Sequence, residues 1–344
     1  MSEAKSRIQV LQVVRLLAAV GIFVYHTEAF GANTGGECAG VEIFFLISGF
    51  LALYATEGKS VSPGRYLVRR LIRLVPLYWI VTLGTYGLIC AKPELSVMSD
   101  TKPMHLIQSL LFIPYRSEAG YIVPVCSVGW TLNYEILFTG LFTIGLWAAP
   151  RRRAEVTAGL AALIVAAGLV FRPGGAALST WTDPLVLEFV GGMLLERLYM
   201  RLPEKPGKGL RAAAGICAAA AIGWLIWTGT GQTAVHRCLR LGIPAFGLLL
   251  SALTVGRGAR FAPPLIQLGN MTYSFYLVEY FTSAAFRMLV PAGLSQGLRG
   301  LALLAGAAVT FLLSWPPYTI IEVRLSRRLN QMFTPGERNL PSGG

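Results

Sequence analysis

Apolar residues run along this chain in stretches of about 20, separated by short polar segments that carry most of the charge. That is the length an α-helix needs to cross the ~30 Å hydrocarbon core of a bilayer. Most of these stretches lack the polar stripe, recurring every three or four residues, that marks a helix of a soluble protein. The pattern therefore predicts an all-α fold: a polytopic bundle of transmembrane helices.

Ten stretches qualify as membrane spans, and they cover residues 8–30, 40–57, 74–91, 127–149, 154–171, 184–200, 211–228, 239–256, 264–288 and 298–321. A shorter apolar stretch, 104–113, lies in the long loop 92–126, and we interpret it as a re-entrant or interfacial helix. We expect a single membrane domain over residues 1–328. A short disordered tail, rich in Pro, Gly and Asn, is predicted over residues 329–344.

The composition agrees with a membrane location and suggests an orientation. Only 14% of the 344 residues are charged, against about 25% in soluble domains. Most of the 30 basic residues precede the first span or follow the even-numbered ones. By the positive-inside rule, those segments and both termini are cytoplasmic. The net charge of +13 is thus spread over helix ends, and it gives no reason to expect nucleic-acid binding.

The five cysteines show neither CxxC nor any other metal-ligand spacing, so no metal site is predicted. Cys38, Cys90 and Cys126 fall near the outer face in this topology, where a disulfide is an alternative. We favour the simpler interpretation of cysteine as a small apolar core residue.

Two ionisable residues interrupt the first span. Because such residues are costly inside a membrane, their presence suggests a function. Arg15 and His26 are eleven residues apart, about 20° from three full helical turns, so they share one face roughly 16 Å apart along the axis. That face is expected to line a polar interior. Alternatively, Arg15 reaches the cytoplasmic headgroups and His26 lies in the outer interface.

The second span begins with GVEIFFLISGF, residues 40–50. Its Glu42 follows soon after His26 and is one candidate to orient the imidazole, as the acid of a hydrolase triad does. Ser48-Gly49 is consistent with close helix packing, with a polar contact to a substrate, or with both.

Two arginines, Arg70 and Arg73, precede the third span in RRLIRLVPLYW, residues 69–79. They share a helix face at the cytoplasmic mouth, and paired guanidinium groups suit phosphates. A plain positive-inside anchor is the alternative.

Two more carboxylates lie within later spans. Glu135 follows Trp130 and Asn133 in VGWTLNYEILF, and with no adjacent cation it must pair with another helix, His26 being the natural partner. Glu279 lies in the outer half of the ninth span.

These clusters together resemble the acyltransferase-3 family of integral membrane acyltransferases. The resemblance rests on an R-x10-H pair (Arg15, His26), FFxxSGF at 44–50 after Glu42, RxxR before P-x-Y (Arg70, Arg73, Pro76, Tyr78), GWTL-x-x-E at 129–135 and LGNMTYSFYL at 268–277. SLLFIPY at 109–115 and DPLVLEFVGGMLLE at 183–196 are similar to the branch that O-acetylates bacterial exopolysaccharides. Many members carry histidine where this chain has Glu279.

The resemblance implies transfer of an acyl group, usually acetyl from cytoplasmic acetyl-CoA, to a sugar hydroxyl at a bacterial inner membrane. The acceptor is expected to be a polysaccharide or its lipid-linked precursor. His26 is then the general base or a transient acyl carrier, and Glu42 or Glu135 orients it. We assign Arg15, Arg70, Arg73 and Tyr78 to the donor, and Ser48, Trp130, Asn133 and Glu279 to the substrate pocket. No metal is required.

Ionisable groups inside a bundle also suit a proton-coupled transporter of a small polar solute. The chain shows no internal inverted repeat, which argues against that alternative. A sensing or scaffolding membrane protein without catalysis is a third class.

Overall fold

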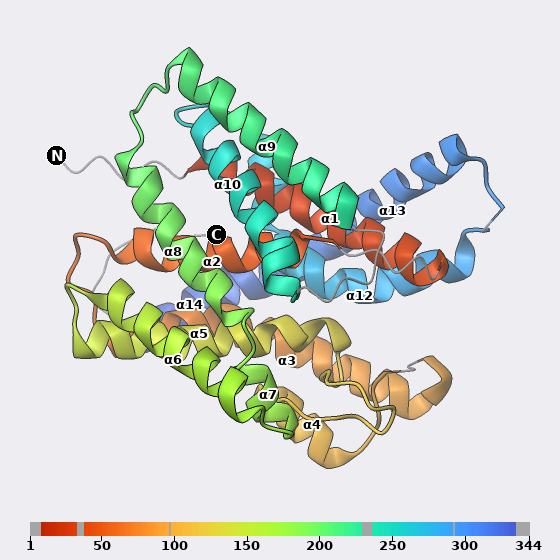
Figure 1. Ribbon diagram of the computed structural model, residues 1–344. Helices are drawn as coiled ribbons and strands as arrows, with labels where there is room; N and C mark the ends of the chain where they lie inside the picture. Colours follow the sequence, from red (N-terminus) through yellow and green to blue (C-terminus); the bar gives the residue numbers. More distant parts are fainter. Residues whose placement is uncertain (1–7, 33–37, 96–97, 229–235, 292, 335–344) are drawn as a thin grey trace.

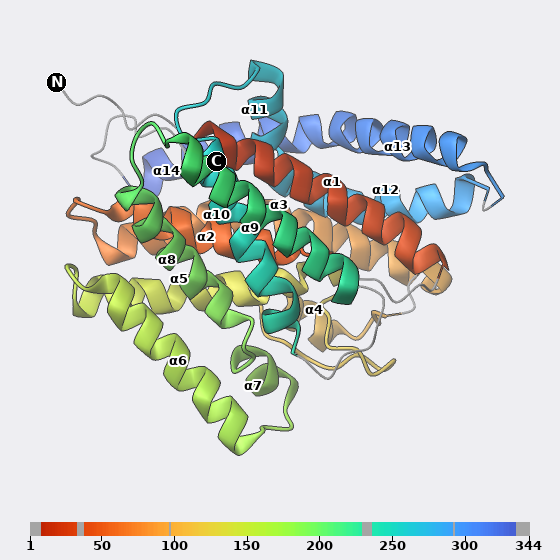
Figure 2. The ribbon, with the colours of Figure 1, turned by 45° about the horizontal axis from the view of Figure 1, so that its top comes forward.

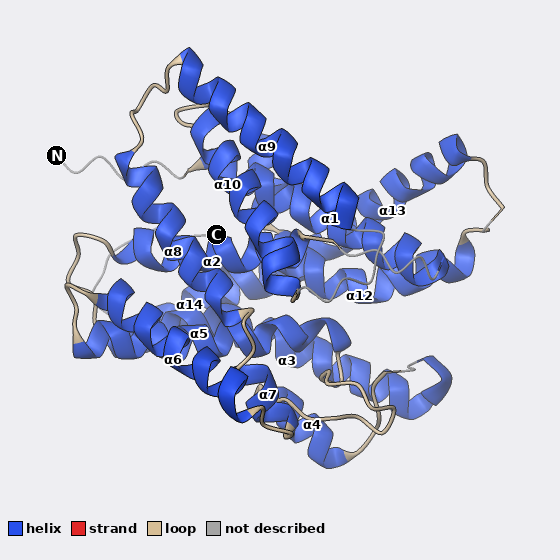
Figure 3. Ribbon diagram, in the orientation of Figure 1, coloured by secondary structure: helices blue, strands red, loops and turns tan. Residues whose placement is uncertain are grey.

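The computed structural model describes residues 8–32, 38–95, 98–228, 236–291 and 293–334. Within these residues every regular element is a helix (Figure 3). The expected all-α fold is therefore confirmed for the described part of the chain.

Ten long helical segments account for most of the described chain (Figure 1). They are α1 (Gln9–Ala32), α2 (Gly40–Thr56), α3 (Pro63–Ala91), α5 (Trp130–Ala148), α6 (Arg153–Phe171), α8 (Val186–Arg201), α9 (Lys208–Thr228), α10 (Ile243–Val255, entered through a π-helical turn at Cys238–Gly242), α12 (Thr272–Leu289), and α13 (Gln296–Pro317), which continues through a π-helical segment (Tyr318–Leu325) into α14 (Ser326–Phe333). The shorter helices are α4 (Pro103–Leu110), α7 (Ala176–Trp181) and α11 (Pro263–Asn270), with single turns at Pro93–Leu95 and Ser127–Gly129.

Six segments of the described chain are long and apolar enough to cross a membrane: Gln9–Thr27, Pro63–Ala91, Arg153–Phe171, Lys208–Trp227, Cys238–Val255 and Gln296–Phe333. Helix α2 is apolar but shorter, at 17 residues. Helices α5, α8 and α12 carry the buried carboxylates Glu135, Glu188 and Glu279, which make them less apolar. The protein is thus a multi-pass membrane protein, and the total of ten spans stays a prediction.

The basic ends of the helices lie together. Figures 1 and 2 show the loops α2–α3, α5–α6, α8–α9 and α10–α11 at one end of the bundle. These loops are short, as is usual between antiparallel neighbours. They hold the basic clusters that the sequence pattern places on one side, so the bundle has one basic end, and α4 and the long loop around it lie toward the other.

Helices α2 and α8 approach to backbone contact through glycines. A Cβ atom on Gly49 would lie 1.9 Å from the carbonyl oxygen of Phe189, and one on Gly192 would lie 2.0 Å from that of Leu46. Only glycine fits at these two positions. Close packing at Ser48-Gly49 is therefore confirmed, and it fixes Ser48 at the centre of the bundle.

Helix α3 begins earlier than the predicted span at 74. It runs unbroken from Pro63 through Pro76 to Ala91, because the basic residues of its first turns are amphipathic enough to continue the helix. Arg70 and Arg73 consequently lie two to three turns inside the helix. The sequence placed these two residues at the mouth, and their position is corrected to the interior.

Three smaller expectations have outcomes. Helix α4 overlaps the predicted 104–113 element, but it begins one residue earlier, at Pro103, and ends at Leu110. The tail predicted over 329–344 begins too early, since α14 keeps residues up to Phe333 helical, and residues 335–344 lie outside the described residues. All five cysteines are free, so no outer disulfide forms.

Candidate active site

A cavity of about 100 Å³ lies inside the bundle between α1, α2, α3, α5 and α12. Several residues that the sequence singled out contribute polar side chains to its lining. The polar lining residues are Arg15, Ser48, Arg70, Arg73, Thr131, Glu135, Thr272, Tyr273 and Tyr276. The remaining lining is apolar and includes Phe44, Phe45 and Leu132. A narrow, mostly apolar space with a few convergent charges is typical of a ligand site.

Hydrogen bonds of Glu135 link helices α2, α3 and α5 at this site. Its Oε1 accepts hydrogen bonds from Ser48 Oγ at 2.9 Å and from Arg70 Nη1 at 3.3 Å. Arg70 Nη2 also donates to the Ser48 carbonyl oxygen at 3.4 Å. Glu135 thus positions Arg70 beside the cavity and neutralises part of its charge.

Arg15 is the most exceptional group in the cavity. It is only 4% exposed, and its Nε and Nη1 atoms have no hydrogen-bond acceptor among the described residues. Glu135 and Glu322 attract it electrostatically, while Arg70 and Arg73 repel it. Leaving part of a buried guanidinium without acceptors is costly.

Glu322 is a residue that the sequence reasoning missed. It follows the last predicted span and lies in the π-helical segment after α13, where Ser274 donates to it from both its backbone N–H (2.8 Å) and its hydroxyl. From there it attracts Arg15 and Arg73. The Pro316-Pro317 pair, which disturbs the end of α13, was the only available signal for an irregular helix here.

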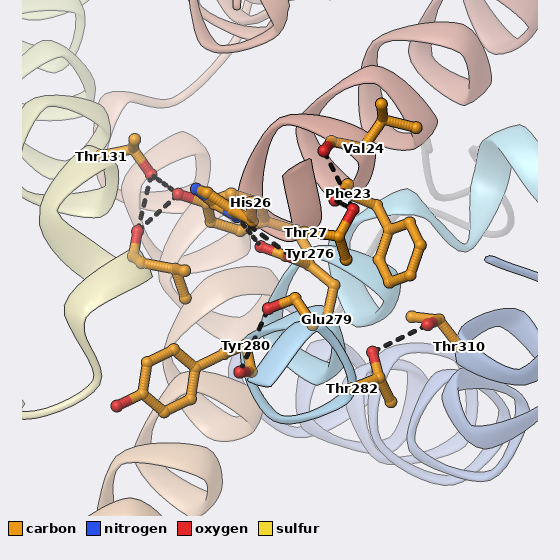
Figure 4. Close-up of polar contacts among 12 residues, drawn as sticks. Phe23, Val24, His26, Thr27, Thr131, Tyr276, Glu279, Tyr280, Thr282 and Thr310 are labelled. Atoms are coloured by element: carbon orange, nitrogen blue, oxygen red, sulfur yellow. Dashed lines mark hydrogen bonds and ion pairs between the residues drawn. The ribbon is translucent and has the colours of Figure 1, made fainter. Parts of the chain in front are cut away.

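His26 pairs with Glu279, at the outer end of α1 (Figure 4). The imidazole Nδ1 lies 2.8 Å from Oε1 and 3.1 Å from Oε2 of Glu279, whose side chain is fully buried on α12. Because a carboxylate accepts, Nδ1 carries the proton of the pair, and Nε2 of a neutral imidazole is left as a base. Arg287 Nη1 donates to the His26 carbonyl oxygen at 2.7 Å and ties the same two helices.

Tyr276 connects the cavity to the His26 pair. It lines the cavity and precedes Glu279 by three residues, so both side chains lie on one face of α12. Its hydroxyl donates to the Val128 carbonyl oxygen at 2.5 Å and lies 3.1 Å from Thr131 Oγ1 (Figure 4). The cavity with its arginines therefore ends one helical turn from the His26 partner.

The sequence assigned the orientation of His26 to Glu42 or Glu135, and the structure corrects both assignments. Glu42 accepts a hydrogen bond from Arg237 Nε at 2.5 Å, and Glu135 is bonded to Ser48 and Arg70. Helix register explains why Glu42 does not reach His26. Gly40, at the start of α2, packs against Ala18 and Ile22, so Glu42 lies nearer the N-terminal half of α1 than His26 does. Glu279, which the sequence placed in the substrate pocket, is the carboxylate that contacts His26.

Tyr78, which the sequence assigned to the donor together with Arg15, Arg70 and Arg73, does not line the cavity that these arginines share. It is fully buried, stacks on Phe112 with ring centroids 4.8 Å apart, and donates to the Ser109 carbonyl oxygen at 3.2 Å. A Cβ atom on Gly129 would lie 2.5 Å from its ring. Tyr78 therefore fastens the long outer loop to α3.

Trp130 and Asn133 also lie away from the cavity lining. The Arg237 guanidinium stands 5.4 Å from the centroid of the Trp130 ring, a cation–π contact beside the Glu42 pair. Asn133 is buried on α5. A contact of either residue with substrate stays a prediction. Arg15, Ser48, Arg70 and Arg73 line one cavity, and their assigned roles in donor and substrate binding stay predictions as well.

Comparison with known proteins identifies the family. An acyltransferase domain model matches residues 8–319, nearly the whole chain. The chain belongs to this acyltransferase family. It is 31% identical over 305 residues to the exopolysaccharide production protein ExoZ of Rhizobium meliloti (strain 1021), covering 84% of this chain and 90% of that protein.

Two further relatives are more distant. The acyltransferase MdmB of Streptomyces mycarofaciens is 28% identical over 323 residues, covering 80% of this chain and 78% of that protein. Protein 2 in the picA locus of Rhizobium radiobacter is 27% identical over 154 residues, which is 40% of this chain. No solved structure matches this chain.

Proposed function

We propose that this protein is a membrane O-acyltransferase that moves a short acyl group, acetyl in the simplest case, from acyl-CoA to a sugar hydroxyl. The observation that carries the proposal is the cavity with three arginines, whose lining residue Tyr276 lies three positions before Glu279, the partner of His26. Family membership supports acyl transfer, and the ExoZ relative supports an exopolysaccharide, or its lipid-linked precursor, as acceptor.

The donor enters from the basic end of the bundle, which the positive-inside rule makes cytoplasmic. Its phosphates are attracted by Arg70 and Arg73, and Arg15 supplies the hydrogen-bond donors that the protein itself does not use. The mostly apolar walls suit the extended pantetheine arm. The thioester then reaches the end of the cavity at Tyr276 and Thr131.

The chemistry follows from the hydrogen bonds of His26. Glu279 holds Nδ1–H, so Nε2 removes the proton of the acceptor hydroxyl. The oxygen attacks the thioester carbonyl, the carbon–sulfur bond breaks, and the imidazolium returns its proton to the CoA thiolate. The negative charge of Glu279 stabilises the imidazolium between these two proton transfers.

Two experiments test this function. Purified protein in detergent, given acetyl-CoA and a candidate acceptor saccharide, should release free CoA in step with acetyl ester formation. The acetyl content of the exopolysaccharide should fall in a deletion strain and return with the wild-type gene. An unchanged acetyl content in the deletion strain contradicts the proposed acceptor, and a lack of CoA binding contradicts the proposed donor.

A further inference from the structure

A second pocket lies at the basic end of the bundle and shares no residue with the arginine cavity. Its volume is about 410 Å³, and it lies between the α2–α3 loop and the end of α5 with the start of α6. Three cations, Lys59, Arg65 and Arg153, line it together with Ser60, Ser62 and Trp147.

Arg153 supplies a buried, incompletely bonded cation to this pocket. The residue is 6% exposed, and its two terminal nitrogens donate to the carbonyl oxygens of Pro150 and Thr56 and to Glu57 Oε2, each at 2.8 Å. Its Nε is buried without an acceptor. Glu57 balances one positive charge, so Lys59 and Arg65 leave the pocket with a net positive charge.

The start of α3 adds to the positive potential. Pro63 occupies the first turn, and the preceding residue, Ser62, forms no side-chain capping hydrogen bond. The first N–H groups of a helix have no intrahelical partner and carry about half a positive charge. Together with Ser60 and Ser62, they supply donors for an anion at the same place as the cations.

Trp147 shows where the pocket opens. Its side chain is 77% exposed at the end of α5, a position typical of the tryptophans that lie at the membrane–water interface. On the inner side, Tyr66 is buried on the α3 face between Ser62 and Arg70, and it packs against Phe142 with ring centroids 5.0 Å apart. The lining thus includes an exposed tryptophan, and the buried Tyr66 lies between the residues of this pocket and Arg70 of the arginine cavity.

We propose that this second pocket binds a phosphate group at the membrane surface. Two sources carry that chemistry: the headgroup of an anionic phospholipid and the phosphates of CoA. The exposed Trp147 and the buried Tyr66 favour the phospholipid, which would hold the α2–α3 and α5–α6 loops together. The inference does not depend on the acyl transfer proposed above.

The test compares two double variants of the full-length protein in neutral detergent. Lys59→Gln/Arg65→Gln removes two exposed cations of the pocket, whereas Arg151→Gln/Arg152→Gln removes two exposed cations of the α5–α6 loop outside it. Native mass spectrometry measures retention of added phosphatidylglycerol against phosphatidylcholine. Calorimetry measures CoA affinity for the same samples.

Each interfacial basic residue contributes enough to anionic lipid binding that phosphatidylglycerol retention should fall at least about fivefold in the pocket variant. The loop variant should retain it as the wild type does. If CoA affinity falls instead, the phosphate is that of the donor. If neither ligand distinguishes the pocket variant from the loop variant, the proposal is overturned.

Discussion

The imidazole of His26 and the carboxylate of Glu279 meet at 2.8 Å from two helices that are more than 250 residues apart in sequence. The carboxylate is fully buried, whereas the His26 side chain is 22% exposed. The imidazole therefore contacts a buried carboxylate and is itself partly accessible. A histidine whose tautomer is set by a carboxylate is suited to act as the base in acyl transfer to a hydroxyl.

Glu279→Gln should lower the acyl-transfer rate by about 10²-fold or more while leaving CoA affinity unchanged. The amide keeps the shape of the side chain but cannot stabilise an imidazolium. Steady-state kinetics of CoA release measures the loss, and thermal unfolding in detergent shows whether the variant stays folded. A rate near that of the wild type would mean that Glu279 only packs against His26.

Arg15→Met should stabilise the unliganded protein and weaken CoA binding at the same time. Replacing a buried, unsatisfied charge with an apolar side chain often stabilises by about 1–4 kcal/mol. Thermal unfolding with and without CoA tests both effects in one titration. A lower unfolding temperature without CoA would show that Arg15 is a structural residue satisfied by the protein.

Arg70→Ala and Arg73→Ala should each weaken CoA binding by about 1.5–3 kcal/mol, the scale of a hydrogen bond to a charged group. High salt should weaken binding to the wild type in the same direction. Isothermal titration calorimetry is the measurement. Unchanged affinity in both variants would reduce these residues to positive-inside anchors.

Glu135→Gln should act through Arg70 and not through His26. Glu135 accepts from Arg70 and Ser48, so its loss should raise the KM for acyl-CoA more than it lowers kcat. The comparison with Glu279→Gln is the control, because that variant should show the opposite split. A fall in kcat alone for Glu135→Gln would contradict this prediction and indicate that Glu135 acts in the chemical step.

Arg237→Ala should destabilise the fold by about 3–5 kcal/mol, because it leaves the fully buried Glu42 without its charge partner. Adding Glu42→Gln to the same chain should recover much of that loss. Thermal unfolding of the two variants provides the comparison. If the double variant is no more stable than the single one, the Arg237 contribution lies in its contact with Trp130 instead.

The sequence predicts the helices well, because a bilayer demands long apolar stretches and leaves few alternatives. It also singles out Arg15, Ser48, Arg70, Arg73 and Glu135 as polar groups too costly for lipid, but the structure was needed to show that they line one cavity. The start of α3 is missed because amphipathic arginines extend a helix beyond its apolar part.

The partner of His26 cannot be read from the sequence, because helix register decides it. Glu42 is near His26 along the chain, yet α2 packs deeper on α1 and delivers it to Arg237. Glu279 is remote from His26 in sequence, but α12 places its carboxylate in contact with the imidazole. Chain proximity is therefore a poor guide to pairing in a bundle whose helices start at different depths.

His26→Ala offers the most direct test of the central claim, with acyl transfer and CoA binding measured on the same purified sample. The matched control is His105→Ala, since His105 on α4 also pairs with a carboxylate, Asp100, at 2.6 Å, but does not line the arginine cavity. The account predicts that His26→Ala binds CoA like the wild type and transfers no acyl group, while His105→Ala still transfers. Acyl transfer at the wild-type rate by His26→Ala would contradict it.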